Sequence, residues 1–362
     1  MTGEPFRFAI VGAGAIANAH VDGMLARPGV AEVVAVCDPR PEGIANLHAR
    51  IPGARGFSSI DDLIGAGGFD AAIIATPHHL HLEQAMAFVT RGIPVLVEKP
   101  VVSTTADVRE LAAASEVSGA YVLPGQTRRF IRETRWARAA LDADPGLVGE
   151  VTTFSLQSFQ DIRAYTRGAN HWLLDAKLAG GGVVISLAIH QLDLVRYLSG
   201  SDYVRVSAAA QYEPPFINGA ESTMAATLEL GNGGVGTMQA SYAATKAPFG
   251  ESLTIIGRYG SIAQHARHIG DTEGPVMISS AHGAAPTVGK DQYDGWAEVE
   301  PPAGLETLDV NPFGNEQRHL IDVVRGDGEP VVTLANNFNT IACIEALMQS
   351  AREGRSVQVE QW

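Results

Sequence analysis

The stretch FRFAIVGAGAIANAH, residues 6–20, carries the clearest structural pattern of the chain. It begins with a short apolar, β-branched run that is typical of a buried strand, turns through two glycines and continues with the spacing of a helix. Gly12, Gly14 and Ala17 stand at the G-x-G-x-x-A spacing. Such a stretch forms the first part of a βαβ unit, with a tight turn at Gly12 and close helix packing at Ala17.

The first third of the chain repeats this alternation. Further apolar strand runs occupy residues 30–38, 69–76, 93–99 and 120–125, and segments with helical spacing separate them. Continuous apolar strands that alternate with helices are typical of a parallel sheet covered on both faces. We therefore expect an α/β protein that begins with a doubly wound, Rossmann-type parallel sheet.

The pattern changes after Pro124. Residues 203–266 contain several runs of period 2 with glycine-rich turns, which predict a large, open, mainly antiparallel sheet. Residues 268–312 are expected to be mostly irregular, and two helices follow them. We predict one domain over residues 1–124 and a second, of α+β type, over residues 125–362. Because such a sheet covers only one face with its own helices, we also predict a homodimer or homotetramer formed through it.

The composition restricts the partners and the compartment. The 362 residues include 26 Lys and Arg against 40 Asp and Glu, a net charge of -14, which disfavours nucleic acid and anionic membranes. Cys37 and Cys343 lie in apolar surroundings, as buried thiols in a reducing compartment do. The start has no signal-peptide pattern, and we see no run of about 18 apolar residues. We expect a cytoplasmic protein that does not enter a membrane.

The glycine turn predicts a dinucleotide site in the first domain. The start of the helix after it offers N–H groups and a positive dipole end to phosphates. Asp38 closes the second strand about 20 residues later, where a carboxylate accepts hydrogen bonds from ribose hydroxyls and repels a 2'-phosphate. Asp38 therefore favours NAD, whereas Arg40 leaves NADP possible.

Two further strand ends carry polar motifs, TPHHLH at residues 76–81 and EKP at residues 98–100. Ligands bind at the carboxyl edge of open parallel sheets, so we expect both motifs at the dinucleotide site. For His81, local packing at a helix start is the alternative. The predicted contacts are Gly12, Ala13, Gly14, Ala15, Ile16, Asp38, Arg40, Thr76, Pro77, His78, His81, Glu98, Lys99 and Pro100.

Taken together, these motifs resemble the Gfo/Idh/MocA oxidoreductase family. The resemblance rests on GAGAIANAH, TPHHLH, VEKPVV, GQTRRF, HWLLDAKLAGGG, IHQLDLVRYLSG and FGNEQRHLIDVVRGDGEP, and it covers nearly the whole chain. It implies a two-domain NAD(P)-dependent dehydrogenase that acts on CH–OH groups. Such an enzyme moves a hydride between nicotinamide and a hydroxyl-bearing carbon of a sugar, polyol or related small molecule, with the first domain holding the dinucleotide and the second the substrate.

The resemblance also implies roles for single residues. Lys99 would contact the reacting hydroxyl and the nicotinamide ribose, His190 would be the acid/base, and Gln126 would approach the nicotinamide. The substrate contacts so implied are Lys99, Arg129, Trp172, Asp175 and His190, with Lys177 nearby and Tyr165 in the polar stretch before them.

The sequence departs from the family pattern next to His190. Ser186 stands where Asp is usual, Ala188 where Gly is usual, and His78 where Asn is usual. A serine forms hydrogen bonds but cannot be an anion, so we predict that Ser186 makes His190 less basic, or that Asp175 or Tyr165 is the general base.

The segment 183–199 is apolar almost all round. At about 100° per residue, Ser186, His190, Asp193 and Tyr197 fall in one stripe, which we expect to face a cleft or an internal polar network. The imidazole of His190, with an ordinary pKa of about 6.5, suits proton transfer, and the ammonium of Lys99 suits a developing alkoxide. The glycines at 180–182 are expected to leave room for a ligand.

Two other functions fit the same residues. One is a glycosidase or lyase that retains NAD and oxidises its substrate transiently; the other is a non-catalytic dinucleotide-binding sensor, which the missing Asp permits. No metal is expected, because His78, His79 and His81 lack ligand spacing. No G-x-S-x-G motif supports a serine hydrolase.

Overall fold

The computed structural model describes residues 4–166, 171–243, 249–266, 276–281, 296–305 and 307–362. The chain divides into two compact units. The first unit comprises Met1–Thr127 and Asn311–Asn337, and the second comprises Arg128–Val310 and Phe338–Trp362. The sequence predicted two domains that follow one another along the chain, residues 1–124 and 125–362. The structure differs from this prediction, because residues 311–337 belong to the first unit.

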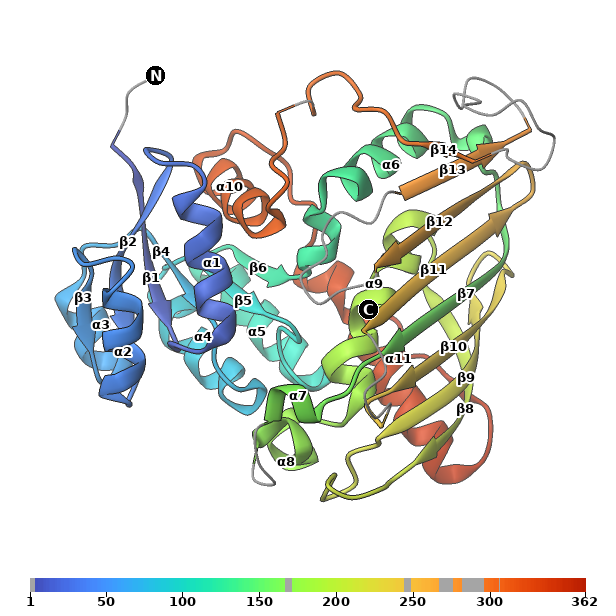
Figure 1. The fold of residues 1–362 in the computed structure, drawn as a ribbon, viewed down its shortest axis with the longest axis horizontal. Helices are drawn as coiled ribbons and strands as arrows, with labels where there is room; N and C mark the ends of the chain where they lie inside the picture. The colour runs from blue at the N-terminus through green and yellow to red at the C-terminus, as the bar shows by residue number, and fades with distance from the viewer. Residues whose placement is uncertain (1–3, 167–170, 244–248, 267–275, 282–295, 306) are drawn as a thin grey trace. The chain divides into compact units, whose positions relative to one another are not determined.

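The first unit contains a six-stranded sheet in the order β3-β2-β1-β4-β5-β6 (Figure 1). Every neighbouring pair is parallel, so the predicted Rossmann-type sheet is confirmed. Its strands are β1 (Phe6–Val11), β2 (Ala31–Cys37), β3 (Arg55–Phe57), β4 (Ala71–Ile74), β5 (Val95–Glu98) and β6 (Val122–Gly125). The sequence pattern missed β3 because it is only three residues long and largely exposed.

Helices cover this sheet. They are α1 (Ala15–Leu25), α2 (Pro41–His48), α3 (Ile60–Ala66), α4 (His81–Val89), α5 (Thr105–Ser118) and α10 (Pro312–Arg325). Helix α10 joins this unit by packing on α1, where a Cβ on Gly23 would lie 2.6 Å from the backbone nitrogen of Gly314. Glycines at this crossing allow the two backbones to approach closely.

The second unit contains a nine-stranded sheet in the order β14-β13-β12-β11-β7-β10-β9-β8-β15. All of its pairs are antiparallel except β7 with β10, so the predicted mainly antiparallel sheet is confirmed. Its strands are β7 (Val151–Phe159), β8 (Tyr203–Gln211), β9 (Thr223–Leu230), β10 (Val235–Ser241), β11 (Gly250–Gly257), β12 (Gly260–Ala266), β13 (Val276–Ser280), β14 (Ala297–Glu298) and β15 (Val357–Gln358). Strands β13 and β14 fall within residues 268–312, which were expected to be mostly irregular.

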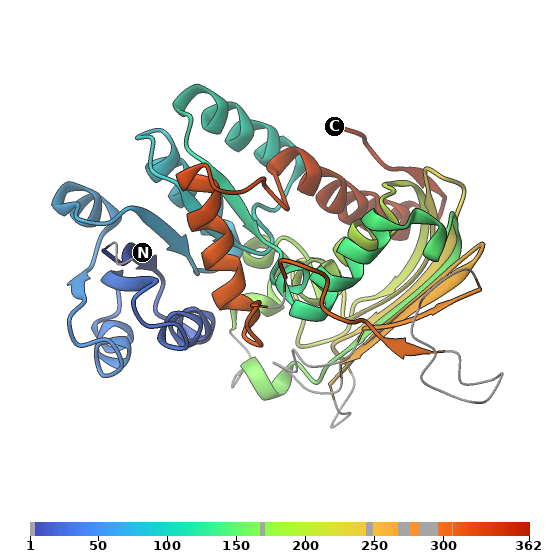
Figure 2. The same cartoon turned by 90° about the horizontal axis from the view of Figure 1, so that it is seen from above.

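Helices of this unit lie on one face of the sheet (Figure 2). They include α6 (Arg132–Ala143), α9 (Ile189–Ser199) and most of α11 (Leu334–Glu353), and the unit also contains the short helices α7 (Arg163–Thr166) and α8 (Ala176–Ala179). Helix α9 packs on β7 and β11, and the strands alternate buried and exposed side chains. One face of the sheet is therefore core and the other is surface.

One stretch of the described chain, Ala176–Ser199, is long and apolar enough to cross a membrane by composition alone. In the structure, 83% of its most apolar window is buried inside the protein. That burial is typical of a core helix of a folded domain.

Candidate functional site

The carboxyl edge of the parallel sheet gathers the residues predicted to bind a dinucleotide. Because β1, β2, β4, β5 and β6 all run in the same direction, the segments that follow them meet at one edge. The segments are Gly12–Gly14, Asp38, Thr76–His81, Lys99–Pro100 and Gln126.

The glycine turn has the geometry of a phosphate-binding loop. Gly12 has φ +93°, and a Cβ there would lie 2.6 Å from the carbonyl oxygen of Ala75 on the neighbouring strand end. Gly14 is the N-cap of α1, makes no side-chain cap hydrogen bond, and would place a Cβ in open space. Gly12 is therefore required by the fold, whereas Gly14 leaves the helix N terminus open to an anion.

Asp38 is held by the turn it follows. Its Oδ2 accepts the N–H of Ala13 at 2.8 Å, and its Oδ1 accepts the N–H of Arg40 at 2.8 Å. The guanidinium of Arg40 donates to both oxygens at 3.0 Å. Burial alone would raise the pKa of Asp38, but the hydrogen bonds from Arg40 and Ala13 outweigh it and hold this pKa below its ordinary value. The carboxylate therefore stays charged. It is paired with the guanidinium of Arg40, whose side chain is largely exposed.

His81 has a different place from the one predicted. Its side chain is fully buried, with Nδ1 2.7 Å from the carbonyl oxygen of Pro100 and Nε2 2.8 Å from that of Thr76. The ring thus ties the end of β4 to the loop after β5 and has no nitrogen left for a dinucleotide. The alternative reading, local packing at a helix start, is the one that the structure supports. The hydroxyl of Thr76 also turns inward, donating to Gln84 Oε1 at 2.6 Å.

Glu98, another predicted contact, is also turned inward. Its side chain is buried, Oε1 lies 2.9 Å from Nε2 of His20, and Oε2 accepts the backbone N–H of Lys99 at 3.1 Å. Gln317 of α10 donates to the carbonyl oxygen of His20 at 2.9 Å and lies 3.2 Å from its Nδ1. Sequence reasoning missed His20 and Gln317, since no local pattern links residues 297 positions apart.

Gln126 has the burial that a ligand contact predicts. The side chain is 1% exposed, and neither its amide nitrogen nor its amide oxygen has a hydrogen-bond partner within the described chain. Buried amides normally have partners, so this one fits a carboxamide or hydroxyl supplied by a ligand.

The next residue, Thr127, donates to the buried carboxylate of Glu316 at 3.2 Å. Burial, and then the nearby Glu98, raise the pKa of Glu316 well above its ordinary value.

The helix that carries His190 begins differently from the expectation. A π-helical turn, η5 (Val184–Ala188), precedes α9 and contains Ser186, so the i, i+4 spacing between Ser186 and His190 is not that of a regular α-helix. Such turns are rare and occur frequently at functional sites. Ser186 is 3% exposed, and His190 is only partly buried on α9.

A buried carboxylate that the sequence did not indicate holds the start of this helix. Glu221 accepts the N–H of Gly182 at 2.8 Å and that of Val184 at 2.9 Å. A Cβ on Gly182 would overlap the backbone of Glu221, and Gly180 ends α8 with φ +82°. These two glycines therefore serve backbone packing and helix capping rather than leaving room for a ligand.

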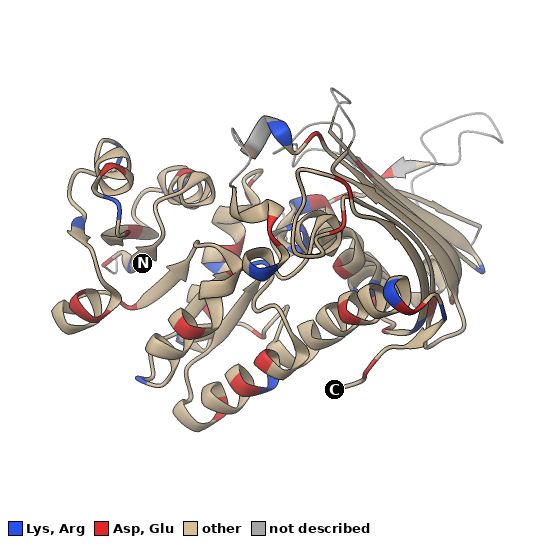
Figure 3. Cartoon of the chain, turned by 90° about the horizontal axis from the view of Figure 1, so that it is seen from below, with Lys and Arg blue, Asp and Glu red and all other residues tan. Residues whose placement is uncertain are grey.

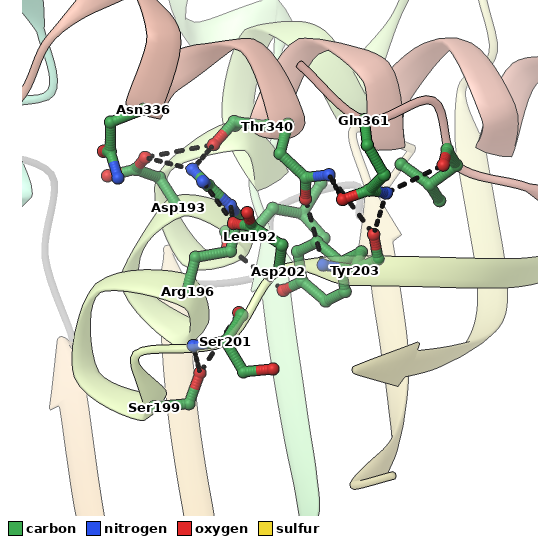
Figure 4. A network of polar contacts seen from close by, with 12 residues as sticks. Leu192, Asp193, Arg196, Ser199, Ser201, Asp202, Tyr203, Asn336, Thr340 and Gln361 are labelled. Atoms are coloured by element: carbon green, nitrogen blue, oxygen red, sulfur yellow. Dashed lines mark hydrogen bonds and ion pairs between the residues drawn. The ribbon is translucent and has the colours of Figure 1, made fainter. Parts of the chain in front are cut away.

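Asp193 faces an internal network (Figure 4). Arg129 donates to both of its oxygens, Nε to Oδ2 at 2.5 Å and Nη2 to Oδ1 at 2.7 Å, and Thr340 donates to Oδ1 at 3.1 Å. The guanidinium carbon of Arg129 also lies 4.9 Å from the ring centroid of Tyr197. Arg129 is 1% exposed and its charge neutralises Asp193 inside the second unit, whereas its contact with substrate stays a prediction.

The segment before α8 carries two of the remaining substrate candidates. The rings of His171 and Trp172 stack at 5.8 Å, and Trp172 begins the short turn η4 (Trp172–Leu174). Asp175 Oδ1 accepts the N–H of Lys177 at 2.9 Å and the side-chain amide of Asn218 at 2.6 Å. The amide of Asn218 and the N–H of Lys177 lower the pKa of Asp175, so it is a poorer base than an ordinary carboxylate. The third candidate, Tyr165, lies in α7, and its side chain lies outside the described residues.

Within the described part of the chain, no group of three or more His, Cys, Asp or Glu is arranged to hold a metal ion.

Each unit has its own candidate surface. In the first unit it is the dinucleotide edge, and in the second it is the helix η5–α9 with the segment 171–175.

Comparisons with known proteins agree with both halves of this description. The family described as "Oxidoreductase family, NAD-binding Rossmann fold" matches residues 6–126, and "Oxidoreductase family, C-terminal alpha/beta domain" matches residues 144–359. The rhizopine catabolism protein MocA of Rhizobium meliloti is 30% identical over 197 residues, which are 54% of this chain and 58% of that protein. The scyllo-inositol 2-dehydrogenase (NAD(+)) of Bacillus subtilis is 26% identical over 98% of this chain and 96% of its own.

A solved structure supports the same fold. The WlbA dehydrogenase from Bordetella pertussis, in complex with NADH and UDP-GlcNAcA, is 24% identical and superposes with a TM-score of 0.81 over 100% of both chains.

Proposed function

This chain belongs to the Gfo/Idh/MocA oxidoreductase family, and from that premise we propose that it is an NAD(P)-dependent dehydrogenase acting on a CH–OH group of a sugar or polyol. The observation that carries the proposal is the carboxyl edge of the parallel sheet. There, Gly12 admits no Cβ, the N terminus of α1 has no side-chain cap, and Gln126 holds a buried amide without a partner in the described chain. This donor set fits a dinucleotide, with its pyrophosphate at α1 and its nicotinamide carboxamide at Gln126.

The cofactor contacts that we retain exclude the inward-facing side chains. Ala15 and Ile16 present backbone N–H groups at the start of α1, whereas the N–H of Ala13 is already donated to Asp38, and Pro77 and His78 follow β4. Asp38 accepts the hydroxyls of the adenosine ribose, since its lowered pKa keeps it a carboxylate. NAD is the expected cofactor, and NADP binds if the exposed Arg40 leaves Asp38 and pairs with a 2'-phosphate.

The chemistry divides between two side chains of this chain. Bound NAD(P) would accept the hydride, and His190 would accept the hydroxyl proton as the hydride leaves the carbon. Lys99 would stabilise the developing alkoxide with its positive charge. The first unit therefore serves the dinucleotide and the second the substrate, and the proposal requires Lys99 and His190 to reach the same hydroxyl.

The substrate contacts proposed in the second unit suit a polyol. Asp175 remains a carboxylate because its pKa is lowered, so it accepts hydroxyl hydrogen bonds and does not replace His190 as the base. The stacked rings of His171 and Trp172 offer an apolar surface to the C–H groups of a sugar ring. Inositols, apiose and glucosides, on which relatives of this chain act by name, are the first compounds to test.

We also propose that the sheet of the second unit forms a homodimer or homotetramer. In the fully described strands β7–β10, the charged side chains are Arg205 and Glu229, which pair with each other at 2.6 Å. Figure 3 shows these strands almost without charge, whereas the helices carry many charged residues. Interface cores are depleted of charge in the same way. Both cysteines are unpaired and buried, in keeping with a cytoplasmic location.

The proposal is tested by incubating the full chain with NAD or NADP and a panel of inositols, aldoses, glycosides and sugar acids, while reduction of the cofactor is followed by absorbance. We expect one compound class to give NADH in amounts that exceed the enzyme and match the ketone formed. Substrate turnover without release of NADH would instead indicate a retained cofactor and a glycosidase or lyase reaction. Binding of NADH with no turnover of any class would indicate a sensor.

A further inference from the structure

The backbone of Lys99, the residue proposed to contact the alkoxide, is hydrogen-bonded to a buried network in the first unit. This network consists of the side chains of Glu98, His20 and Gln317, and we call it the Glu98 relay. The backbone N–H of Lys99 donates to Glu98 Oε2 at 3.1 Å, and the other oxygen, Oε1, faces Nε2 of His20 at 2.9 Å. Gln317 of α10 completes the relay through its contacts with Nδ1 and the carbonyl oxygen of His20. The three buried side chains therefore lead from α10 through α1 to the end of β5.

The hydrogen bonds assign the proton on the histidine. Because the amide nitrogen of Gln317 is a donor, Nδ1 of His20 accepts, and the ring proton lies on Nε2, from which it is donated to Glu98. The ring of Phe313 packs edge-on against His20 at 5.0 Å and fixes its plane. His20 is fully buried and Glu98 is 5% exposed, so water does not compete with these bonds.

We propose that His20, acting through Glu98, is a positioning residue for Lys99. The carboxylate, oriented by the imidazole, fixes the backbone at the point where Lys99 leaves the strand, and thereby fixes the starting point of the lysine side chain. At metal sites, hydrogen-bonded groups outside the ligand shell orient the ligating side chains in a comparable way. The inference rests on the proposed role of Lys99 at the nicotinamide ribose.

A carboxylate at the opposite edge of the same sheet provides a matched control. Asp70 accepts the backbone N–H of Arg7 at 2.8 Å and pairs with its guanidinium at 2.7 Å. This pair shares with the Glu98 relay a backbone N–H and a side-chain donor on one carboxylate, but both of its side chains are partly exposed. It lies at the amino ends of β1 and β4, away from the strand ends where the dinucleotide is proposed.

The test is a double-mutant cycle on the dissociation constant of NADH, measured by fluorescence with the full chain. Lys99→Ala, His20→Phe and the double variant are compared with the wild type. We expect His20→Phe to weaken NADH binding about fivefold in the wild-type background and less than twofold once Lys99 is alanine. His20→Gln, which retains a donor to Glu98, is expected to restore most of the affinity, and Asp70→Asn to leave it unchanged.

A purely structural role for His20 would give equal fold-changes in both backgrounds, and that result overturns the inference. If His20→Phe does not fold, Glu98→Gln takes its place in the cycle, with the same loss of additivity expected. The proposed function fails separately: a wild-type chain that does not bind NADH contradicts it, whereas NADH binding with an additive cycle contradicts only the positioning role.

Discussion

The dinucleotide edge of the first unit and the helix η5–α9 of the second hold their polar groups in different ways. At the edge, the decisive features are backbone conformations within one short stretch, the positive φ of Gly12 and the open N terminus of α1. Along the helix, they are side-chain contacts between distant segments, the ion pair of Arg129 with Asp193 and the hydrogen bonds of Glu221 to the start of η5. A local pattern can therefore reveal the first site, whereas the second depends on pairings that only the folded chain makes.

The largest loss of activity is expected when a proposed reacting side chain is removed, Lys99 in the first unit or His190 in the second. Lys99→Ala and His190→Ala should each lower kcat by about 100-fold to 10,000-fold, as loss of alkoxide stabilisation or of acid/base catalysis does. Turnover of the compound found in the panel is the measurement. Activity within tenfold of the wild type would remove that residue from the reaction.

Breaking the ion pair between Arg129 and Asp193 inside the second unit should lower the free energy of unfolding. Arg129→Met leaves the carboxylate of Asp193 buried without its bidentate partner, and we expect a loss of about 3–5 kcal/mol in the free energy of unfolding. Urea unfolding measures this loss. In the double variant with Asp193→Leu, much of the stability should return, because no unpaired charge remains. If Arg129→Met is as stable as the wild type and loses only substrate affinity, Arg129 contacts substrate after all.

Two glycines of the first unit should separate folding from binding. Gly12→Ala meets both a strained φ and the carbonyl of Ala75, so it should lower stability by about 1–3 kcal/mol or more and abolish NADH binding. Gly14→Ala meets no atom within 4 Å, so it should fold as the wild type does and bind NADH more weakly. Thermal unfolding and NADH titration of both variants provide the comparison. Equal destabilisation by the two substitutions would contradict it.

Glu221 should give the second unit a pH dependence of stability. Burial raises the pKa of Glu221 above its ordinary value of 4.5, so the folded state holds this proton more tightly than the unfolded state. The stability of the wild type relative to Glu221→Gln should therefore fall as the pH rises from 4.5 through the raised pKa. Urea unfolding of both proteins across this range tests the sign. A difference that does not change with pH would mean that Glu221 has its ordinary pKa when folded.

The smallest expected effect is at Ser186. Placing a carboxylate near His190 with Ser186→Asp should favour the imidazolium and move the acidic limb of the pH profile of kcat/KM upward. We expect about one pH unit, with turnover at the optimum changed by less than tenfold. An unchanged profile would exclude Ser186 from the environment of His190.

The sequence alone predicted the two kinds of sheet, the glycine turn and the place of Asp38, because short-range periodicity and turn chemistry determine them. It did not predict that α10 joins the first unit, since packing between Gly23 and Gly314 has no local signature. The sequence motifs also predicted ligand contacts for Arg129 and His81, whose polar atoms have partners inside the protein. A motif shows which residues are polar, but only packing shows whether their partners lie inside the protein.

The most direct test of the proposed function is a crystal structure of the full chain with NAD and the compound that the panel identifies. The proposed chemistry requires the side chains of Lys99 and His190 to lie within hydrogen-bond reach, about 2.6–3.2 Å, of the same hydroxyl of that compound. A complex in which either side chain faces away from the ligand would contradict the assignment of both as the catalytic pair.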